Sequence, residues 1–304
     1  MTRAIGIDIG GTKTIVAAVN GSGGIQARVT FETRSERGFS VGLAELSESI
    51  RQVSGQAQWV AEEISGIGIG CTGPVSPARG TVHNPFTLPG WEDADIISPL
   101  RDTFGLPVWL ENDADAAAVG EFHFGAGRLA DPVVMITFGT GVGGAVLIGG
   151  RIHRGVNGEH PELGHIPVSR DGPECYCGTQ GCWESLASGT AISSLGTPLG
   201  FQDSRAVFGA YTRKVEATTI IDQARKATAI AAWTILHTFL PQRIILGGGI
   251  GEAHFDVFAP IIRDQISRAT QIPKNAVEVV KAELGQDAGV IGAAALVFQN
   301  TTHP

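Results

Sequence analysis

The chain has 304 residues, of which 42 are glycine and only 4 are cysteine, with 43% hydrophobic and 17% charged side chains. This length predicts about two domains with a sizeable buried core, which excludes disorder as the main character of the chain. The 30 acidic and 22 basic residues give a net charge of −8, and no run of lysine or arginine offers the concentrated positive surface that nucleic acid binding requires.

Neither a targeting signal nor a membrane span is expected. The first three residues lead directly into a strand-like run, without the basic stretch and apolar core of a signal peptide. The most apolar windows, 227–240 and 288–298, are shorter than the roughly 20 residues that cross a bilayer. We therefore expect a soluble cytoplasmic protein that has neither a nucleic acid nor a membrane partner.

Two strand–turn–strand patterns occur in the sequence. Residues 4–9 predict a short apolar strand, which a glycine pair turns into a second apolar run at 14–19. The pattern returns at 133–138, where a turn rich in Gly and Thr leads into 145–148. Two such copies, about 130 residues apart, indicate an internal duplication.

Strands alternate with helical windows in the rest of the chain, which favours an α/β fold. Before the second copy, the expected elements are a helix at 41–53, a strand at 64–70, a helix at 94–104 and a strand at 107–110. After it, the expected elements are helices near 186–195, 206–211 and 219–239, a strand at 243–246 and a helical tail at 288–299.

The first turn has the composition of a phosphate-binding loop. Gly10, Gly11 and Thr12 offer backbone N–H groups and a hydroxyl, and Lys13 offers a positive charge. Asp8, at the end of the strand, is suited to hold Mg²⁺ through its water shell. A single Gly-Gly-Thr hairpin is more often a simple turn. The second Gly/Thr turn favours the functional interpretation, because two such hairpins can clamp a polyphosphate.

A third glycine cluster, at 247–249, follows an apolar strand. It is typical of backbone that lies against a flat base, and a tight strand-to-helix connection is the alternative. None of the three clusters matches the Gly-x-x-x-x-Gly-Lys-Ser/Thr loop or the Gly-x-Gly-x-x-Gly turn of dinucleotide dehydrogenases.

With these motifs the chain resembles the ROK family, which comprises sugar kinases and sugar-responsive repressors. The resemblance implies an α/β actin-like ATPase (ribonuclease H-like) fold with two lobes around a central cleft and duplicated β-hairpin phosphate turns. Residues 1–114 and 288–304 would form the small N-terminal lobe, and 115–287 the large C-terminal lobe with a zinc-binding loop. The implied ATP and Mg²⁺ ligands are Asp8, Gly10, Gly11, Thr12, Lys13, Thr140 and Gly141, with Gly248 and Gly249 near the adenosine.

An acidic segment, 111–115, follows the strand at 107–110 and opens an alanine-rich helical stretch. Phosphoryl transfer to an alcohol requires a carboxylate that orients the hydroxyl and accepts its proton. Capping of the helix is the alternative role for Asp113 or Asp115. The resemblance matches Asn112 and Asp113 to the Asn-Asp pair of the family, and implies Asp113 as catalytic base and sugar ligand and Asn112 as a second sugar ligand.

Further sugar-binding groups are implied at Glu162, His165 and Glu184. Carboxylates accept pairs of hydroxyl protons, as recognition of a polyhydroxylated ring requires. A surface salt bridge is the alternative role for each glutamate. Asn84 and Gly90 resemble the loop that closes over the sugar in glucokinase-like members.

Three cysteines, Cys175, Cys177 and Cys182, lie within eight residues, and His165 precedes them by ten. Three thiolates and one imidazole complete a closed tetrahedral site, which predicts a structural zinc ion. A disulfide would leave one of the three cysteines unpaired. The stretch also matches the family pattern Cys-x-Cys-Gly-x-x-Gly-Cys. Zinc would fix one ring nitrogen of His165, leave the other facing the sugar, and hold Glu184 at the pocket wall.

These features predict an ATP- and Mg²⁺-dependent kinase that phosphorylates a hexose, with O6 of glucose or a related aldohexose as the leading acceptor. His160–Pro161 replaces the Ala-Gly pair usual before Glu162 and is closer to fructokinase-like members. Fructose, mannose, N-acetylmannosamine and N-acetylglucosamine therefore stay open as substrates, and other phosphoryl donors stay open beside ATP. The alternative class is a non-catalytic sugar-sensing regulator. The family resemblance also implies a homodimer.

Overall fold

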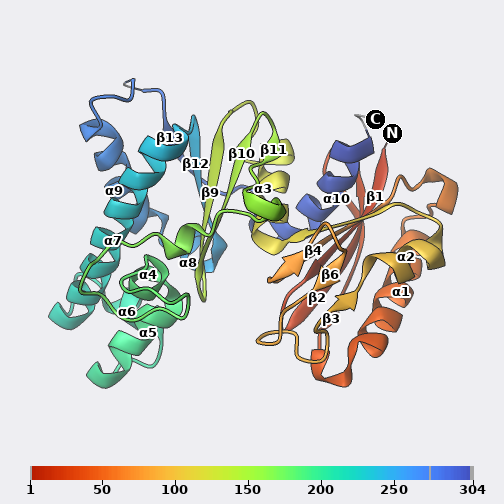
Figure 1. Ribbon diagram of the computed structural model, residues 1–304, viewed down its shortest axis with the longest axis horizontal. Helices are drawn as coiled ribbons and strands as arrows, with labels where there is room; N and C mark the ends of the chain where they lie inside the picture. The colour runs from red at the N-terminus through yellow and green to blue at the C-terminus, as the bar shows by residue number, and fades with distance from the viewer. Residues whose placement is uncertain (1, 274, 302–304) are drawn as a thin grey trace. The chain divides into compact units, whose positions relative to one another are not determined.

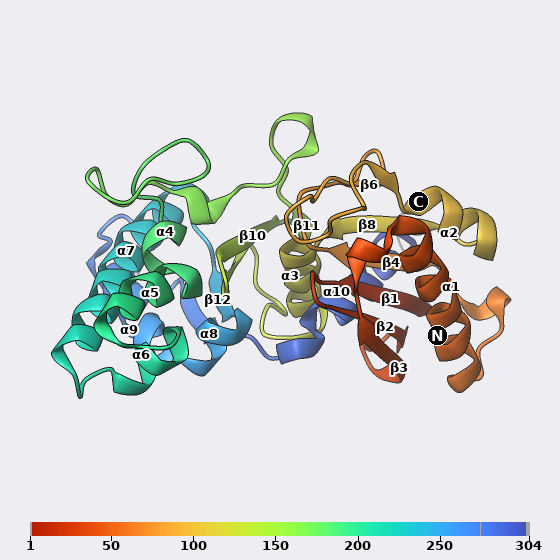
Figure 2. The ribbon, with the colours of Figure 1, turned by 90° about the horizontal axis from the view of Figure 1, so that it is seen from below.

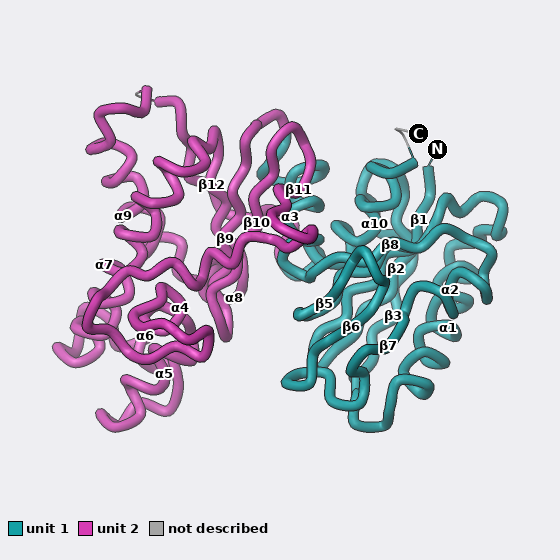
Figure 3. The backbone as a smooth tube through the Cα atoms, in the orientation of Figure 1, with its two compact units in different colours: residues 1–128, 286–304 teal, residues 129–285 magenta. Residues whose placement is uncertain are grey.

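The computed structural model describes residues 2–273 and 275–301, which form two compact units (Figure 3). Unit 1 comprises residues 1–128 and 286–304, and unit 2 comprises residues 129–285. Helix α3 (Asp113–Phe124) falls in unit 1, whereas the expected boundary at residue 114 assigns it to the large lobe. It stays with unit 1 because it packs closely on α10 (Ala288–Thr301): a Cβ atom on Gly292 would lie 1.7 Å from the carbonyl oxygen of Ala116.

Unit 1 is built on a five-stranded sheet with the order β3-β2-β1-β4-β8. The first three strands are antiparallel neighbours, and β4 and β8 continue the sheet in parallel with β1. The strands are β1 (Arg3–Ile9), β2 (Lys13–Asn20), β3 (Ile25–Glu32), β4 (Ile67–Cys71) and β8 (Val108–Asn112).

Helices cover both faces of this sheet (Figures 1 and 2). Side chains alternate between the faces of a strand, and the isoleucines of β1 pack in a core with α1 (Phe39–Gln56) and α2 (Ile97–Phe104). The opposite face of β1 meets α10, and the approach is so close that a Cβ on Gly6 would lie 2.1 Å from the carbonyl oxygen of Val290. Asp8 belongs to this second face, at the carboxyl end of the strand.

Unit 2 repeats the same sheet, with the order β11-β10-β9-β12-β13 and the same sequence of antiparallel and parallel pairs. The repeat confirms the internal duplication that the sequence predicts and agrees with the actin-like ATPase fold that the family resemblance implies. The strands are β9 (Val133–Phe138), β10 (Val142–Ile148), β11 (Arg151–Ile152), β12 (Arg243–Gly247) and β13 (Glu278–Lys281).

The core of unit 2 lies between this sheet and its helices, with Phe138, Trp183 and Phe258 at its centre. The helices are α4 (Glu184–Ala187), α5 (Gly189–Gly196), α6 (Ser204–Ala210), α7 (Val215–Phe239), α8 (Gly248–Ala253) and α9 (Phe255–Arg268). A small sheet in unit 1 contains β5 (Val75–Ser76), β6 (Thr81–Val82) and β7 (Ala94–Asp95). Within the described residues, no helix combines the length and hydrophobicity needed to cross a membrane.

Candidate active site

The first glycine turn joins β1 to β2. The Gly10 N–H donates to the carbonyl oxygen of Lys13 at 3.0 Å, and the Thr33 hydroxyl donates to the carbonyl oxygen of Gly10 at 2.7 Å. A Cβ on Gly11 would lie 3.1 Å from two atoms of Thr87, so the turn passes close to that residue. Thr12 and Lys13 remain exposed. The turn is thus held by its own backbone and by Thr33, with a hydroxyl and an ammonium group presented to solvent.

Asp8 lies one residue before the end of β1, beside the start of α10, where a Cβ on Gly289 would lie 2.6 Å from the carboxylate oxygen Oδ2. Burial raises the pKa of Asp8 to about 6, and the charge of Lys13 partly opposes that rise. Burial disfavours the charged form of a carboxylate, and a nearby cation stabilises that form. Asp8 therefore fits the predicted role of holding a hydrated Mg²⁺ ion.

The second glycine turn joins β9 to β10. The Gly139 N–H donates to the carbonyl oxygen of Gly141 at 2.9 Å, and the Gly189 N–H at the start of α5 donates to the carbonyl oxygen of Gly139 at 2.8 Å. Thr190 donates both its N–H and its hydroxyl to the carbonyl oxygen of Thr140, at 3.2 and 2.9 Å. The start of α5 thus occupies the carbonyl groups of Gly139 and Thr140, and the Thr140 side chain is exposed.

A cavity of about 790 Å³ opens beside this second turn, within unit 2. It lies in the size range of small-ligand pockets. Gly248 has a φ of +78°, and a Cβ there would lie 2.5 Å from the carbonyl oxygen of Phe138, so this position requires glycine. Gly249 lines the cavity, and a Cβ there would meet nothing within 4 Å. Phe208 and His254, also in the lining, stack with their rings 3.8 Å apart.

The Asn112–Asp113 pair lies where β8 passes into α3. The Asn112 side chain caps the helix by accepting the Ala114 N–H at 2.9 Å, and Asp113 accepts the same N–H at 2.8 Å. Asp113 is partly buried in the first helical turn. Asp115, in contrast, is fully buried. Asn112 thus supplies the cap, and Asp113 lies at the carboxyl end of the sheet.

Asn84 is buried inside its own loop, with 1% of its surface exposed. Its side chain bonds to the carbonyl oxygens of Thr72 and Gly73, to the Thr87 hydroxyl, and to the N–H groups of Phe86 and Thr87. The amide of Asn84 therefore shapes the loop from within. Gly90 has a φ of +88°, and its N–H donates to the Glu92 carboxylate at 3.0 Å.

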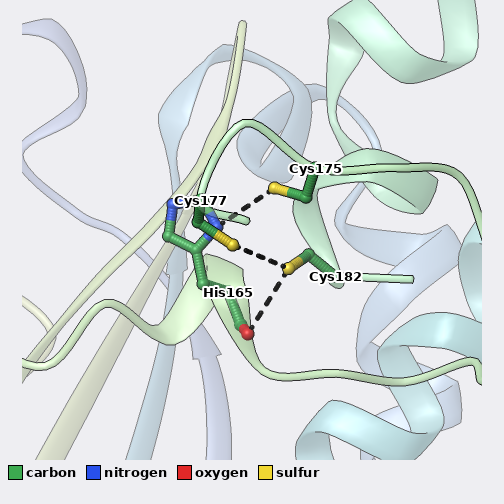
Figure 4. A group of neighbouring side chains, drawn as sticks. All are labelled: His165, Cys175, Cys177 and Cys182. Carbon is green, nitrogen blue, oxygen red and sulfur yellow. Dashed lines mark hydrogen bonds between the residues drawn. The ribbon is translucent and has the colours of Figure 1, made fainter. Parts of the chain in front are cut away.

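The Cys/His cluster is brought together as the spacing predicts (Figure 4). The Nδ1 atom of His165 lies 3.4 Å from the Sγ of Cys175, and the Sγ atoms of Cys177 and Cys182 lie 3.5 Å apart. All four ligand atoms lie within 4.8 Å of one another. Zinc bound to sulfur at about 2.3 Å and nitrogen at about 2.0 Å needs such separations, so the donor set fits a tetrahedral zinc ion. The second ring nitrogen of His165 points away from the sulfur atoms (Figure 4).

Two predicted sugar-binding carboxylates, Glu162 and Glu184, lie on either side of this cluster in the sequence. The Nε2 atom of His160 lies 3.3 Å from Oε1 of Glu162, and this contact holds the pKa of Glu162 below its usual range. Glu184 accepts the Val142 N–H on Oε2 at 2.8 Å and the Tyr176 hydroxyl on Oε1 at 2.9 Å.

No local sequence pattern predicts a role for Tyr176. His160 differs from the family pattern, and this difference alone does not predict its contact with Glu162. The available signals were the aromatic residue between two cysteines and the His-Pro-Glu spacing.

The sequence matches the ROK family over residues 4–300. The glucokinase of Thermotoga maritima is 35% identical, over 97% of this chain and 97% of its own length. The ROK hexokinase structure from Thermus thermophilus has a TM-score of 0.88 at 30% identity and covers 100% of both chains. A ROK family glucokinase from Streptomyces griseus, in complex with glucose and AMPPNP, has a TM-score of 0.75 at 30% identity, with 98% and 99% coverage. With its duplicated sheets, its two Gly/Thr hairpins and its Cys/His cluster, this chain belongs to the ROK family.

Proposed function

We propose that this protein is an ATP-dependent hexokinase of the glucokinase type, which transfers the γ-phosphoryl group of ATP to O6 of glucose or a related aldohexose. The observation that carries the proposal is the Asn112–Asp113 pair at the end of β8 and the start of α3. A carboxylate at that place is the group that a sugar hydroxyl needs as it attacks a phosphoryl group. The glucokinase names of the relatives point to the same acceptor.

The two glycine turns are the proposed ATP-binding elements. Thr12 and Lys13 offer a hydroxyl and a charge from the first turn, and Thr140 offers a hydroxyl from the second. The cavity lined by Gly249 is proposed to receive the adenosine. Mg²⁺ bound with ATP would supply positive charge to the β- and γ-phosphates, and Asp8 is the group proposed to hold it through water.

The proposed sugar-binding groups of unit 1 are Asn112, Asp113 and Gly90, and those of unit 2 are Glu162, His165 and Glu184. Asp113 accepts the proton of the attacking hydroxyl, and the other polar groups orient the ring. Asn84 contributes through the shape of its loop, because its side-chain amide already forms hydrogen bonds to backbone groups there.

The Cys/His cluster is proposed to hold a structural zinc ion. Its role toward the sugar is indirect, because fixing Nδ1 of His165 sets the direction of the other ring nitrogen. We also propose a cytoplasmic homodimer, supported by the family resemblance. Its mass in solution would be measured by light scattering.

The test is a screen of purified protein with glucose, fructose, mannose, N-acetylmannosamine and N-acetylglucosamine. ADP release is measured with ATP as donor, and sugar phosphate formation is measured with polyphosphate as donor. We expect glucose with ATP to give the highest kcat/KM. Release of ADP that no sugar stimulates would contradict the kinase proposal and favour a sugar-sensing regulator.

The Asp113→Asn variant tests the base. It keeps an acceptor for the Ala114 N–H, so the fold should persist while kcat falls by about 10²- to 10⁴-fold. Asp95→Asn is the matched control, because Asp95 likewise accepts N–H groups at a helix start, those of Ile97 and Ser98 at 3.0 and 2.9 Å. Full activity of Asp113→Asn would remove Asp113 as the base.

A further inference from the structure

Glu184 is held by two donors from different segments of unit 2. The Val142 N–H, at the start of β10, donates to Oε2 at 2.8 Å, and the Tyr176 hydroxyl, in the cysteine loop, donates to Oε1 at 2.9 Å. Each carboxylate oxygen therefore has one protein partner in these contacts. The carboxylate connects the second glycine turn to the zinc-binding loop.

The position of Tyr176 is not explained by burial. Its side chain is 84% exposed, although it lies between two proposed zinc ligands, Cys175 and Cys177. Its ring packs edge-on against His165, with the ring centroids 5.0 Å apart and the planes at 87°. An exposed aromatic ring adds little to a core. The specific features of this side chain are its contact with His165 and its hydroxyl bond to Glu184.

The two donors leave acceptor capacity on both oxygens of Glu184. An ionised carboxylate has about four lone-pair sites, and the bonds from Val142 and Tyr176 occupy one on each oxygen. One site on each oxygen remains, which suits two adjacent hydroxyl groups of a ring. Both protein bonds are needed to fix the plane of the carboxylate, because a single bond leaves it free to turn.

We propose that Tyr176 is a positioning residue for sugar binding, whose hydroxyl orients the Glu184 carboxylate toward a pair of neighbouring hydroxyls on the substrate. This inference rests on the proposed function, in which Glu184 binds the sugar. Without the hydroxyl, Glu184 keeps its bond to Val142 but is ordered only when the sugar binds. That ordering cost reduces affinity for the sugar and leaves the phosphoryl transfer step unchanged.

The test is the Tyr176→Phe variant, which keeps the ring against His165 and removes only the hydroxyl. We expect the KM for glucose to rise about fivefold to tenfold, with kcat and the KM for ATP within about twofold of the wild type. Zinc content and thermal midpoint are measured on the same samples, and both should be unchanged. The control is Tyr211→Phe, at the only other tyrosine, whose hydroxyl lies 3.4 Å from Asp222.

A double-mutant cycle shows whether Tyr176 acts through Glu184. In a Glu184→Ala background, Tyr176→Phe should change kcat/KM for glucose by less than about twofold, because the partner of the hydroxyl is gone. A wild-type KM in the zinc-loaded single variant would overturn the inference and leave the proposed kinase intact, as would an equal loss in both backgrounds. If the wild type phosphorylates no hexose, the proposed function fails first, and the inference falls with it.

Discussion

The Gly141→Ala variant tests how closely the second glycine turn is tied to the proposed sugar-binding carboxylate. A Cβ on Gly141 would lie 2.3 Å from Oε2 of Glu184 and 3.3 Å from its carboxyl carbon. The backbone at Gly141 does not have a positive φ, so alanine is compatible with its conformation and the clash with Glu184 is the main disturbance.

The size of the effect follows from that distance. The carboxylate must move by about 1 Å to reach an ordinary separation, which lengthens the bond from Val142 beyond hydrogen-bonding range and disturbs the bond from Tyr176. A displacement of about 1 Å in a binding group can lower kcat/KM by about 100-fold. We expect a loss of that order for glucose.

The assay is steady-state kinetics with glucose and ATP varied separately. Gly209→Ala is the control, because a Cβ there would meet nothing within 4 Å. In a Glu184→Ala background the added methyl group has no carboxylate to displace, so Gly141→Ala should cause little further loss of kcat/KM for glucose. Gly141→Ala with a wild-type kcat/KM for glucose would refute the reasoning, and an undiminished loss in the Glu184→Ala background would show that the methyl group acts elsewhere.

Three further predictions concern the metals and the charged groups. Metal analysis should find about one zinc per chain. The Cys182→Ser variant should lose both the zinc and the affinity for glucose. Metal-free protein with full sugar affinity would contradict the zinc assignment. Because the pKa of Asp8 is raised to about 6, kcat/KM for ATP should fall as the pH drops through that value and the carboxylate is protonated. Lys13 lowers this pKa, so Lys13→Met should move the fall to higher pH, and an unmoved profile would exclude Asp8 as its source. His160→Ala should raise the KM for glucose by about threefold to tenfold through loss of the contact with Glu162. An unchanged KM would show that this contact does not contribute to glucose binding.

The parts of the fold that the sequence predicts well are those with a strong local pattern. The strands β1, β2 and β9 are apolar runs that flank glycine turns, and the alanine-rich tail forms α10 as expected. The helix expected near 186–195 is instead two helices, because the chain is extended at Ser188, which caps α5 with its hydroxyl.

Edge elements and contacts between distant residues were not predictable in the same way. The strands β3 and β13 lie at sheet edges and mix polar with apolar residues, so their sequences lack a distinctive strand pattern. Helix α9 contains Pro260, which weakens its helical pattern. In the site, the spacing of the three cysteines and His165 predicts the cluster of possible zinc ligands that the structure brings together. The bond between Val142 and Glu184 joins residues 42 positions apart, and it depends on tertiary packing that no local motif reports.

The central claim is that this protein moves the γ-phosphoryl group of ATP onto a hexose. The most direct measurement is ³¹P NMR of purified protein with glucose, ATP and Mg²⁺, compared with the same mixture containing Asp113→Asn. The account predicts glucose 6-phosphate and ADP in equal amounts with the wild type, and almost none with the variant over the same time. ADP and inorganic phosphate without any sugar phosphate, for glucose and for every other hexose in the screen, would contradict it.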